Sequence, residues 1–294
     1  MSDKKRWSIK NEYLYAEVCE YGAELKKLEC GGIDYIWYSD PKYWSYCAPI
    51  LWPSVGTLKD KEAYFKGKLY KHTQHGLLRN QDFKLVSLKD DEIVLENYYN
   101  DNTLSMYPYK YHAIISYKLE GKKIYTKVEI INLDSDVMPF NIGGHPAFNC
   151  PMYDGDKFND YVIEFEKEET FASPHIMPNA TLDFSRIDAR YNNLKVLNLN
   201  KNMFFLDTII NTNVKSKSVK LLNKDGKGIK FDFDGFKTLA IWTPFNDAPF
   251  VCIEPWNGYN DLIDSDKDFL KKKDLIKLNS NEKYSVGYTI EIID

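Results

Sequence analysis

The sequence predicts an all-β protein, built as either a β-sandwich or a β-barrel. Short runs of alternating apolar and polar residues recur along the chain, with turn residues between them. The chain is rich in aromatic residues, with 22 Tyr, 16 Phe and 6 Trp, which favour strands. Helix signals are sparse, so we expect only a few short helices.

The N-terminal half contains three stretches that read as strands. Residues 13–38 alternate and are broken at Gly22 and at Gly31-Gly32. Residues 92–99 form a short run, and residues 109–133 form two long runs around Leu-Glu-Gly-Lys-Lys, which is typical of a hairpin.

The C-terminal half continues the pattern. Residues 161–168 predict a strand, residues 218–242 predict a hairpin around Asp225-Gly226 and a third strand, and residues 283–293 predict a closing strand. Residues 264–278 could form a helical turn or two, capped by Asp264 or Ser265. No internal repeat is present.

The length of 294 residues allows two domains of about 150 residues, although all-β folds often reach 200 to 250 residues as one domain. No low-complexity linker divides the chain, so we expect one domain over residues 1–294. The net charge of −4 offers no basic field for nucleic acid. No apolar run reaches the roughly 18 residues of a membrane span.

The N-terminal residues lack the apolar run of a signal peptide. The five cysteines are scattered and form no Cys-x-x-Cys pair, which argues against a disulfide framework or a structural zinc site. This usage suits a reducing compartment, so we expect a cytoplasmic protein.

Two of the five histidines stand beside unusual backbone residues. His75 precedes Gly76, and His145 lies between Gly143-Gly144 and Pro146. Glycine and proline adopt backbone conformations that other residues avoid, and such positions are common at functional sites and in tight turns. His112 is expected to be an ordinary sheet residue and His175 a loop residue, while His72 is left open.

Glu254 is the third candidate, because it follows the apolar run of residues 249–253, which reads as a buried strand. We expect Pro255 and Trp256 to end that strand. A carboxylate at such a place is costly unless it is paired or used. The alternatives are a side chain turned to solvent or a cap on a backbone amide.

Two histidines and a glutamate can form a metal site or an acid–base set. No His-Glu-x-x-His pair supports the metal site. Histidine titrates near neutral pH, and burial can raise the pKa of a glutamate, so proton transfer is the better match. No Gly-x-Ser-x-Gly elbow or phosphate-binding loop is present.

Three motifs, in this order, resemble the aldose 1-epimerase (galactose mutarotase) family and most closely its LacX-like branch. They are QHGLLRN at residues 74–80, GGHPAFNCP at residues 143–151 and IEPWNG at residues 253–258. Residues 22–60 and 206–221 resemble the same branch, so the similarity runs from Gly22 to the C-terminal strand.

The resemblance implies a large antiparallel β-sandwich (supersandwich) with a groove on one sheet face. It implies interconversion of the α and β anomers of a free aldose, without a cofactor or a metal. The protein would be a monomer or homodimer with a small sugar as its partner, and with no nucleic-acid or membrane partner.

Carried over by motif, the resemblance makes Glu254 the base at O1 and His145 the acid at the ring oxygen, with His75 as a second donor. Arg79 and Asp207 would contact sugar hydroxyls. Trp256 or Trp44 would stack on the apolar face of the sugar, and the alternative for both is packing in the core. The same two possibilities are open for Trp52.

The sequence departs from the branch near the expected sugar contacts, which bears on the identity of the sugar. Asn80 stands where an aspartate is usual, and Leu206-Asp207-Thr208 replaces Asn-Asp-Ala. One rival function is a hexose-6-phosphate mutarotase, with Lys59, Lys61 and Lys71 near the His-Gly motif to hold the phosphate. A second rival is a carbohydrate-binding protein without catalytic activity. A third is a glycosidase, which needs a second carboxylate beside Glu254; Asp261 and Asp264 are near in sequence, but both read as loop residues.

Overall fold

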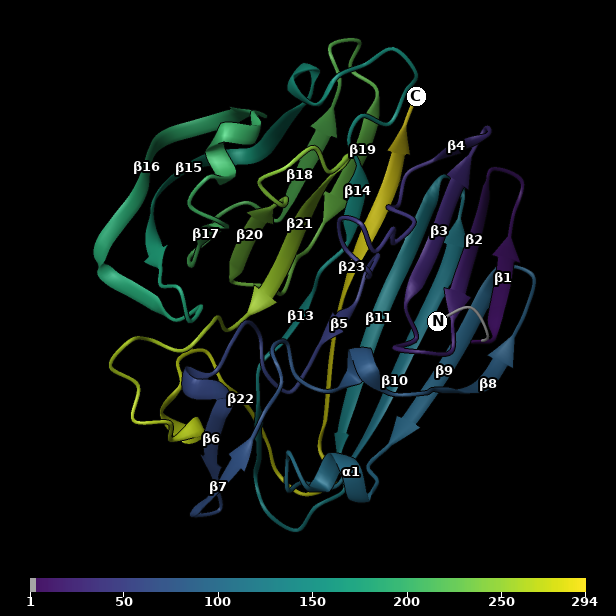
Figure 1. Ribbon diagram of the computed structural model, residues 1–294. Coiled ribbons are helices and arrows are strands. Elements are labelled where there is room, and N and C mark those ends of the chain that lie inside the picture. The colour runs from purple at the N-terminus through teal and green to yellow at the C-terminus, as the bar shows by residue number, and fades with distance from the viewer. Residues whose placement is uncertain (1–3) are drawn as a thin grey trace.

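The computed structural model describes residues 4–294 as a stack of antiparallel sheets, which confirms the predicted β-sandwich (Figure 1). The largest sheet has nine strands, in the spatial order β16 (Leu182–Asn198), β15 (Val162–Ile176), β18 (Ser218–Leu222), β19 (Gly228–Asp232), β23 (Lys283–Ile293), β11 (Lys123–Asn132), β10 (Tyr111–Glu120), β9 (Glu92–Tyr98) and β8 (Lys84–Leu88).

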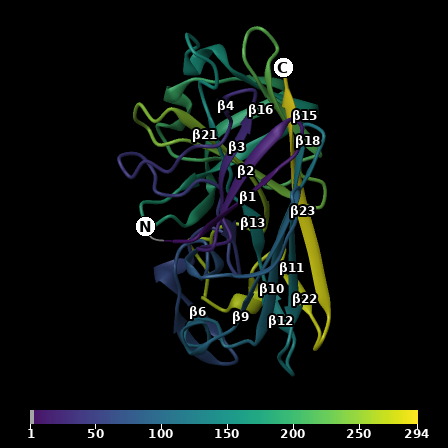
Figure 2. The same ribbon diagram turned by 90° about the vertical axis from the view of Figure 1, so that its right-hand side faces the viewer.

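Two smaller sheets form the opposing layer. A six-stranded sheet runs β17 (Ile209–Asn211), β20 (Thr238–Trp242), β21 (Phe250–Asn257), β13 (Ile142–Gly144) and β5 (Ile50–Leu51), and β14 (Ala147–Asn149) also pairs with β21. A four-stranded sheet runs β1 (Arg6–Lys10), β2 (Leu14–Cys19), β3 (Leu25–Cys30) and β4 (Ile33–Asp34). The side view places β23 and β11 along one side, with β1–β4 and β21 on the other (Figure 2).

Two hairpin-sized sheets and short helical turns complete the fold. The small sheets are β6 (Glu62–Phe65) with β7 (Lys68–Lys71), and β12 (Met138–Phe140) with β22 (Ile276–Leu278). The helical elements are α1 (Asp101–Leu104) and the 3₁₀ turns η1 (Lys59–Lys61), η2 (Leu78–Asn80), η3 (Phe158–Asp160), η4 (Lys201–Phe204) and η5 (Phe269–Lys271). Within residues 4–294, no helix is long and apolar enough to cross a membrane.

The main core lies between the two layers and follows from the alternation of the strands. In β10, Ala113, Ile115 and Tyr117 point inward and are fully buried, while their neighbours are partly exposed. In β21, Val251 and Ile253 enter the same core from the opposite layer. The residues of β21 that alternate with them are also buried: Phe250 and Cys252 pack in a second apolar cluster, and Glu254 and Trp256 line the pocket described below.

The prediction of a helical turn or two in residues 264–278 is confirmed in part, but neither Asp264 nor Ser265 caps the turn. This segment contains only the three-residue turn η5, capped by Asp268, and its end is strand β22. The carboxylates of Asp266 and Asp268 each accept a hydrogen bond from a backbone amide two residues further on. The bond to Asp268 is the N-cap of η5, and the bond to Asp266 stabilises the turn that precedes it.

The strand predicted at residues 161–168 is longer than expected. Strand β15 continues to Ile176, so His175 lies on a strand and not in a loop. Its pairing with β16 contains several register shifts, two of them beside Pro174. Bulges of this kind break the simple alternation that sequence reasoning uses to detect strands.

Candidate active site

The paired glycines before His145 allow two side chains from other strands to come close to β13. A Cβ atom on Gly143 would lie 2.6 Å from Cδ1 of Trp256, and one on Gly144 would lie 2.5 Å from Cε1 of Tyr288. Both distances are too short for any residue with a side chain. The glycines therefore allow β13 to lie close both to the indole of Trp256 on the neighbouring strand β21 and to the ring of Tyr288 on β23 in the opposite layer. His145 follows in the gap before β14.

Glu254 lies inside β21, so the expectation that Pro255 and Trp256 end the strand is wrong. Pro255 is tolerated because of the same gap between β13 and β14. The amide of Ile253 donates to the carbonyl of Pro146 on that side of β21. Backbone nitrogens two residues apart in a strand point to the same side, so the nitrogen of Pro255 faces the gap as well. Because no strand lies there to accept a hydrogen bond, the missing N–H of Pro255 leaves the sheet pairing intact.

The side chains of His145 and Glu254 meet at this gap. The Nε2 atom of His145 lies 3.0 Å from Oε2 of Glu254, and both side chains are almost completely buried. Burial raises the pKa of Glu254, while the neighbouring imidazole of His145 opposes the shift. Within residues 4–294, neither Glu254 Oε2 nor His145 Nδ1 has a partner in hydrogen-bonding geometry. A carboxylate and an imidazole with free positions can exchange protons with a bound molecule.

The donor atoms of His145, Glu254 and Cys252 lie within 4.8 Å of one another, which is close enough to surround a metal ion. However, burial raises the pKa of Cys252 well above its ordinary value, and the charge of Glu254 adds to the shift. A protonated thiol is a poor metal ligand, because the thiolate is the form that binds metals. The donor set therefore fits an acid–base pair better than a metal centre.

Aromatic rings hold the imidazole of His145 in place. The indole of Trp44 stacks on it, with centroids 4.6 Å apart and an interplanar angle of 27°. Trp242 and His75 contact it edge-on, at centroid distances of 5.8 and 5.4 Å. Packing on several sides restricts the ring to one orientation, with Nε2 toward Glu254.

His75 lines the same pocket with a defined tautomer. The backbone N–H of Gly56 donates to its Nδ1 atom over 3.2 Å, which places the proton of the neutral ring on Nε2. Burial lowers the pKa of His75 well below its ordinary value, and the charges of His145 and Arg79 add to the effect. His75 is therefore a neutral N–H donor.

Gly76 explains the glycine in the His-Gly motif. Its φ angle of 76° is unfavourable for residues with a side chain, and a Cβ atom would lie 2.1 Å from the carbonyl oxygen of Trp52.

Arg79 brings a partly buried positive charge to the pocket wall. Its guanidinium carbon lies 4.7 Å from the centre of the Tyr46 ring. Burial lowers the pKa of Arg79, yet an arginine keeps its proton. Its buried Nε atom has no hydrogen-bond partner in the described chain. A buried donor without a partner is costly, so this side chain is suited to a ligand that supplies acceptors.

All six residues selected from the sequence line one cavity of about 280 Å³. They are His75, Arg79, His145, Asp207, Glu254 and Trp256. Asp207 is exposed at the rim, on a residue with a φ angle of 85°, and it accepts a hydrogen bond from the hydroxyl of Thr208. The indole Nε1 atom of Trp256 is buried and has no partner within residues 4–294.

The sequence model of the family described as aldose 1-epimerase matches residues 5–291. The chain belongs to the aldose 1-epimerase family. It is 33% identical to the LacX protein of Lactococcus lactis over 298 aligned residues, which cover 97% of this chain and 99% of that protein.

Solved structures agree with this membership. A galactose mutarotase related enzyme from Lactobacillus acidophilus superposes with a TM-score of 0.93 and 25% identity, over 99% of this chain and 98% of that one. A galactose mutarotase-like protein from Lactobacillus casei gives a TM-score of 0.88 and 26% identity, over 98% of this chain and 100% of that one.

Several residues that line the cavity of this aldose 1-epimerase family member were not selected from the sequence. They are Gln74, Ile176, Ala180, Thr208, Ile210, Trp242 and Asn260. Two of them could have been selected from the sequence: Gln74 directly precedes His75 in its motif, and Trp242 ends a predicted strand. Ile176 and Ala180 come from the end of β15 and the turn after it, where the alternation is broken. Trp44, left open by the sequence, also lines the cavity, whereas Trp52 packs in the core.

The other three histidines lie outside the cavity. His112 is a sheet residue, as predicted, and its Nε2 atom lies 2.9 Å from a carboxylate oxygen of Glu96. His175 pairs with Asp188 over 2.8 Å. His72, which the sequence left open, is buried, and its Nδ1 atom lies 3.1 Å from the carbonyl oxygen of Thr73.

Proposed function

We propose that the chain interconverts the α and β anomers of an unphosphorylated aldose by opening and closing the sugar ring. The observation that carries this proposal is the 3.0 Å contact between His145 and Glu254 in a cavity that also presents Arg79. Anomerisation requires an acid and a base at two oxygens that are both bonded to C1. Two groups that touch each other can reach two such neighbouring oxygens.

In the proposed reaction, Glu254 accepts the proton of the O1 hydroxyl while His145 donates a proton to the ring oxygen. The C1–O1 bond becomes a carbonyl as the bond between C1 and the ring oxygen breaks. Rotation about C1–C2 then presents the other face of the aldehyde. The reverse proton transfers close the ring and restore both side chains, so no cofactor is consumed. Each positioned acid or base contributes typically about 10²- to 10⁴-fold.

The remaining cavity residues have complementary roles in this proposal. His75 donates the N–H of its Nε2 atom toward the ring oxygen and stabilises the charge that develops there. Arg79 offers a planar set of donors to adjacent hydroxyls, and Asp207 offers acceptors at the rim. Trp256 lies beside Glu254 and presents apolar surface to the sugar.

The positions of three lysines argue against a phosphorylated substrate. Lys59, Lys61 and Lys71 were the candidates for a phosphate site, and none of them is among the described residues that line the cavity. Lys59 instead donates to the carbonyl of Ser265 over 3.0 Å. Arg79 remains the one Lys or Arg side chain in the lining within residues 4–294.

Polarimetry of freshly dissolved α-glucose and α-galactose, with and without the protein, tests the proposal. We expect the protein to accelerate mutarotation of a free aldose at least tenfold more efficiently than that of glucose 6-phosphate. Higher activity on the phosphate would favour the hexose-6-phosphate reaction. Sugar binding without acceleration would make the chain a carbohydrate-binding protein. Cleavage of an aryl glycoside would indicate a glycosidase.

A further inference from the structure

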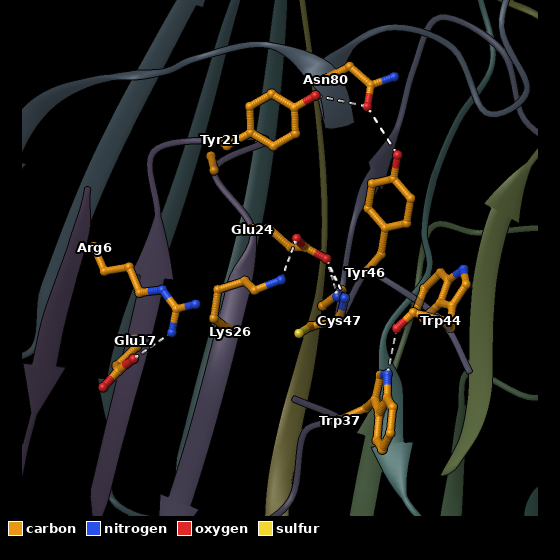
Figure 3. A network of polar contacts seen from close by, with 12 residues as sticks. Arg6, Glu17, Tyr21, Glu24, Lys26, Trp37, Trp44, Tyr46, Cys47 and Asn80 are labelled. Atoms are coloured by element: carbon orange, nitrogen blue, oxygen red, sulfur yellow. Dashed lines mark hydrogen bonds and ion pairs between the residues drawn. The ribbon is translucent and has the colours of Figure 1, made fainter. Parts of the chain in front are cut away.

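A buried glutamate stands behind one wall of the cavity, in the turn between β2 and β3. Glu24 is 5% exposed and does not line the cavity. Its Oε1 atom accepts the backbone amides of Cys47 and Ala48, the second over 2.9 Å. Its Oε2 atom lies 3.0 Å from Nζ of Lys26 (Figure 3). The carboxylate thus fixes the backbone of a segment to which it is not adjacent in sequence.

That segment supplies two of the rings at the site. Trp44 stacks on His145, and the ring of Tyr46 lies under the guanidinium of Arg79. The segment has a further anchor, since the indole N–H of Trp37 donates to the carbonyl of Trp44 over 2.9 Å (Figure 3). A shift of the backbone at residues 47–48 would move both rings, because they are only a few residues away.

The turn that carries Glu24 also contacts the chain segment around Arg79, which forms another part of the cavity wall. The amide of Gly22 donates to the carbonyl of Gln81 over 2.7 Å, and a Cβ atom on Gly22 would lie 3.0 Å from the carbonyl oxygen of Arg79. The hydroxyls of Tyr21 and Tyr46 both donate to Oδ1 of Asn80, over 3.3 and 3.1 Å (Figure 3). One turn therefore contacts the segment of Arg79 and the segment of Trp44.

We propose that Glu24 is a positioning residue that sets the orientation of His145 through Trp44 and of Arg79 through Tyr46. This inference rests on the proposed function. Hydrogen bonds to an ionised carboxylate are stronger than bonds to a neutral acceptor. Loss of the acceptor leaves two buried amides without partners. The segment then relaxes, so proton transfer by His145 weakens and the sugar is held less firmly by Arg79.

The test compares Glu24→Leu, which removes both acceptor oxygens, with Glu24→Gln, which keeps one. Asp134→Leu is a matched control, because Asp134 is 9% exposed, accepts the amides of Lys110 and Asp136, and pairs with Lys66 over 3.1 Å. It is not among the residues that line the cavity. All assays are run well below the melting temperature of each variant.

We expect Glu24→Leu to lower kcat and raise KM, with a fall in kcat/KM of roughly 10- to 100-fold. Glu24→Gln should recover part of this loss, and Asp134→Leu should stay within about twofold of wild type. A double variant of Glu24→Leu with Trp44→Ala should lose no more kcat than the worse single variant, because both act through one contact.

Several results would overturn the inference. They are a wild-type kcat/KM in Glu24→Leu, equal losses in Asp134→Leu, or additive losses of kcat in the double variant. If Glu24→Leu does not fold, Glu24→Asp, whose shorter side chain withdraws the carboxylate from the two amides, takes its place, and an unchanged kcat/KM in that variant has the same meaning. If the wild-type protein itself does not accelerate mutarotation, the proposed function has failed, which is a separate result.

Discussion

The Nε2 atom of His145 lies 3.0 Å from Oε2 of Glu254, at the gap where β13 ends and β14 begins. His145 follows β13 and Glu254 lies on β21, and these two strands are distant in sequence and adjacent in the six-stranded sheet. The contact places an imidazole and a carboxylate of raised pKa side by side in a cavity of about 280 Å³. The predictions below start from this pair and extend to the residues that hold it.

Substitution of either member of the pair should slow the chemical step. Glu254→Gln removes the proposed base and His145→Asn removes the proposed acid, so each should lower kcat for mutarotation by about 10²- to 10⁴-fold. Polarimetry of a fresh α-aldose solution measures the effect. His112→Asn is the control, since His112 lies on the nine-stranded sheet, outside the cavity. Wild-type rates in both site variants would disprove the assignment.

The pH dependence of kcat/KM should reflect the protonation of Glu254. Burial raises the pKa of Glu254, and the base acts only when it is deprotonated. Activity should therefore fall on the acid side with a midpoint above the ordinary glutamate value of about 4.3. The midpoint belongs to the coupled pair of His145 and Glu254. Initial rates corrected for spontaneous mutarotation give the profile, and a midpoint at or below about 4.3 would contradict the prediction.

Arg79 should contribute mainly to substrate binding. Arg79→Lys keeps the charge but loses the planar fork of donors, so KM should rise roughly 10- to 100-fold with a smaller change in kcat. Initial rates over a range of sugar concentrations separate the two constants. Arg6→Lys is a suitable control, because Arg6 pairs with Glu17 on the surface of the four-stranded sheet. An unchanged KM in Arg79→Lys would exclude the proposed contact.

Gly143 should not tolerate even a methyl group. In Gly143→Ala the new Cβ atom would lie 2.6 Å from the indole of Trp256, so the indole or β13 must move. We expect a loss of about 1–3 kcal/mol in the free energy of unfolding, together with reduced activity. Urea unfolding and polarimetry measure the two effects.

Gly121→Ala provides the comparison for this variant. In contrast to Gly143, a Cβ atom on Gly121 would have no atom of a non-neighbouring residue within 4 Å, although its φ angle is 56°. It should lose stability through backbone strain alone and keep its activity. Full activity in Gly143→Ala would show that the close approach is not required at the site.

His72 should make the protein less stable in acid. Its pKa is lowered to about 4 in the folded chain by burial, whereas an unfolded histidine titrates near 6.5. The unfolded chain therefore binds this proton first as the pH falls, and stability is lost from about pH 7 toward pH 4. Between pH 8 and pH 5, wild type should lose about 2 kcal/mol more than His72→Leu. Equal losses in urea unfolding would refute the prediction.

Most strands of the nine-stranded sheet could be predicted, because apolar and polar residues alternate regularly along them. The hairpin of β10 and β11 and the closing strand β23 lie where the sequence pattern places them. The β15–β16 hairpin was largely missed, since its pairing contains repeated register shifts. The helical turn expected after residue 264 begins only at Phe269, because Asp268, and not Asp264 or Ser265, provides its cap.

The candidate site could be predicted as a set of residues but not as a geometry. Motifs selected His75, His145 and Glu254, and all three line one cavity. The same motifs led to a wrong expectation for Pro255, which continues β21 because its missing N–H faces a gap in the sheet. Trp242 and Ile210 enter the cavity from strands whose facing direction depends on the pairing.

The sequence alone determined the all-β class, the family and the residue types available for chemistry, because strand alternation and short motifs are local properties. The tertiary structure decided which side chains meet. It placed His145 against Glu254, fixed the tautomer of His75 through the amide of Gly56, and set Glu24 behind the wall that carries Trp44. These relationships depend on the register between distant strands, and no local pattern of residues records that register.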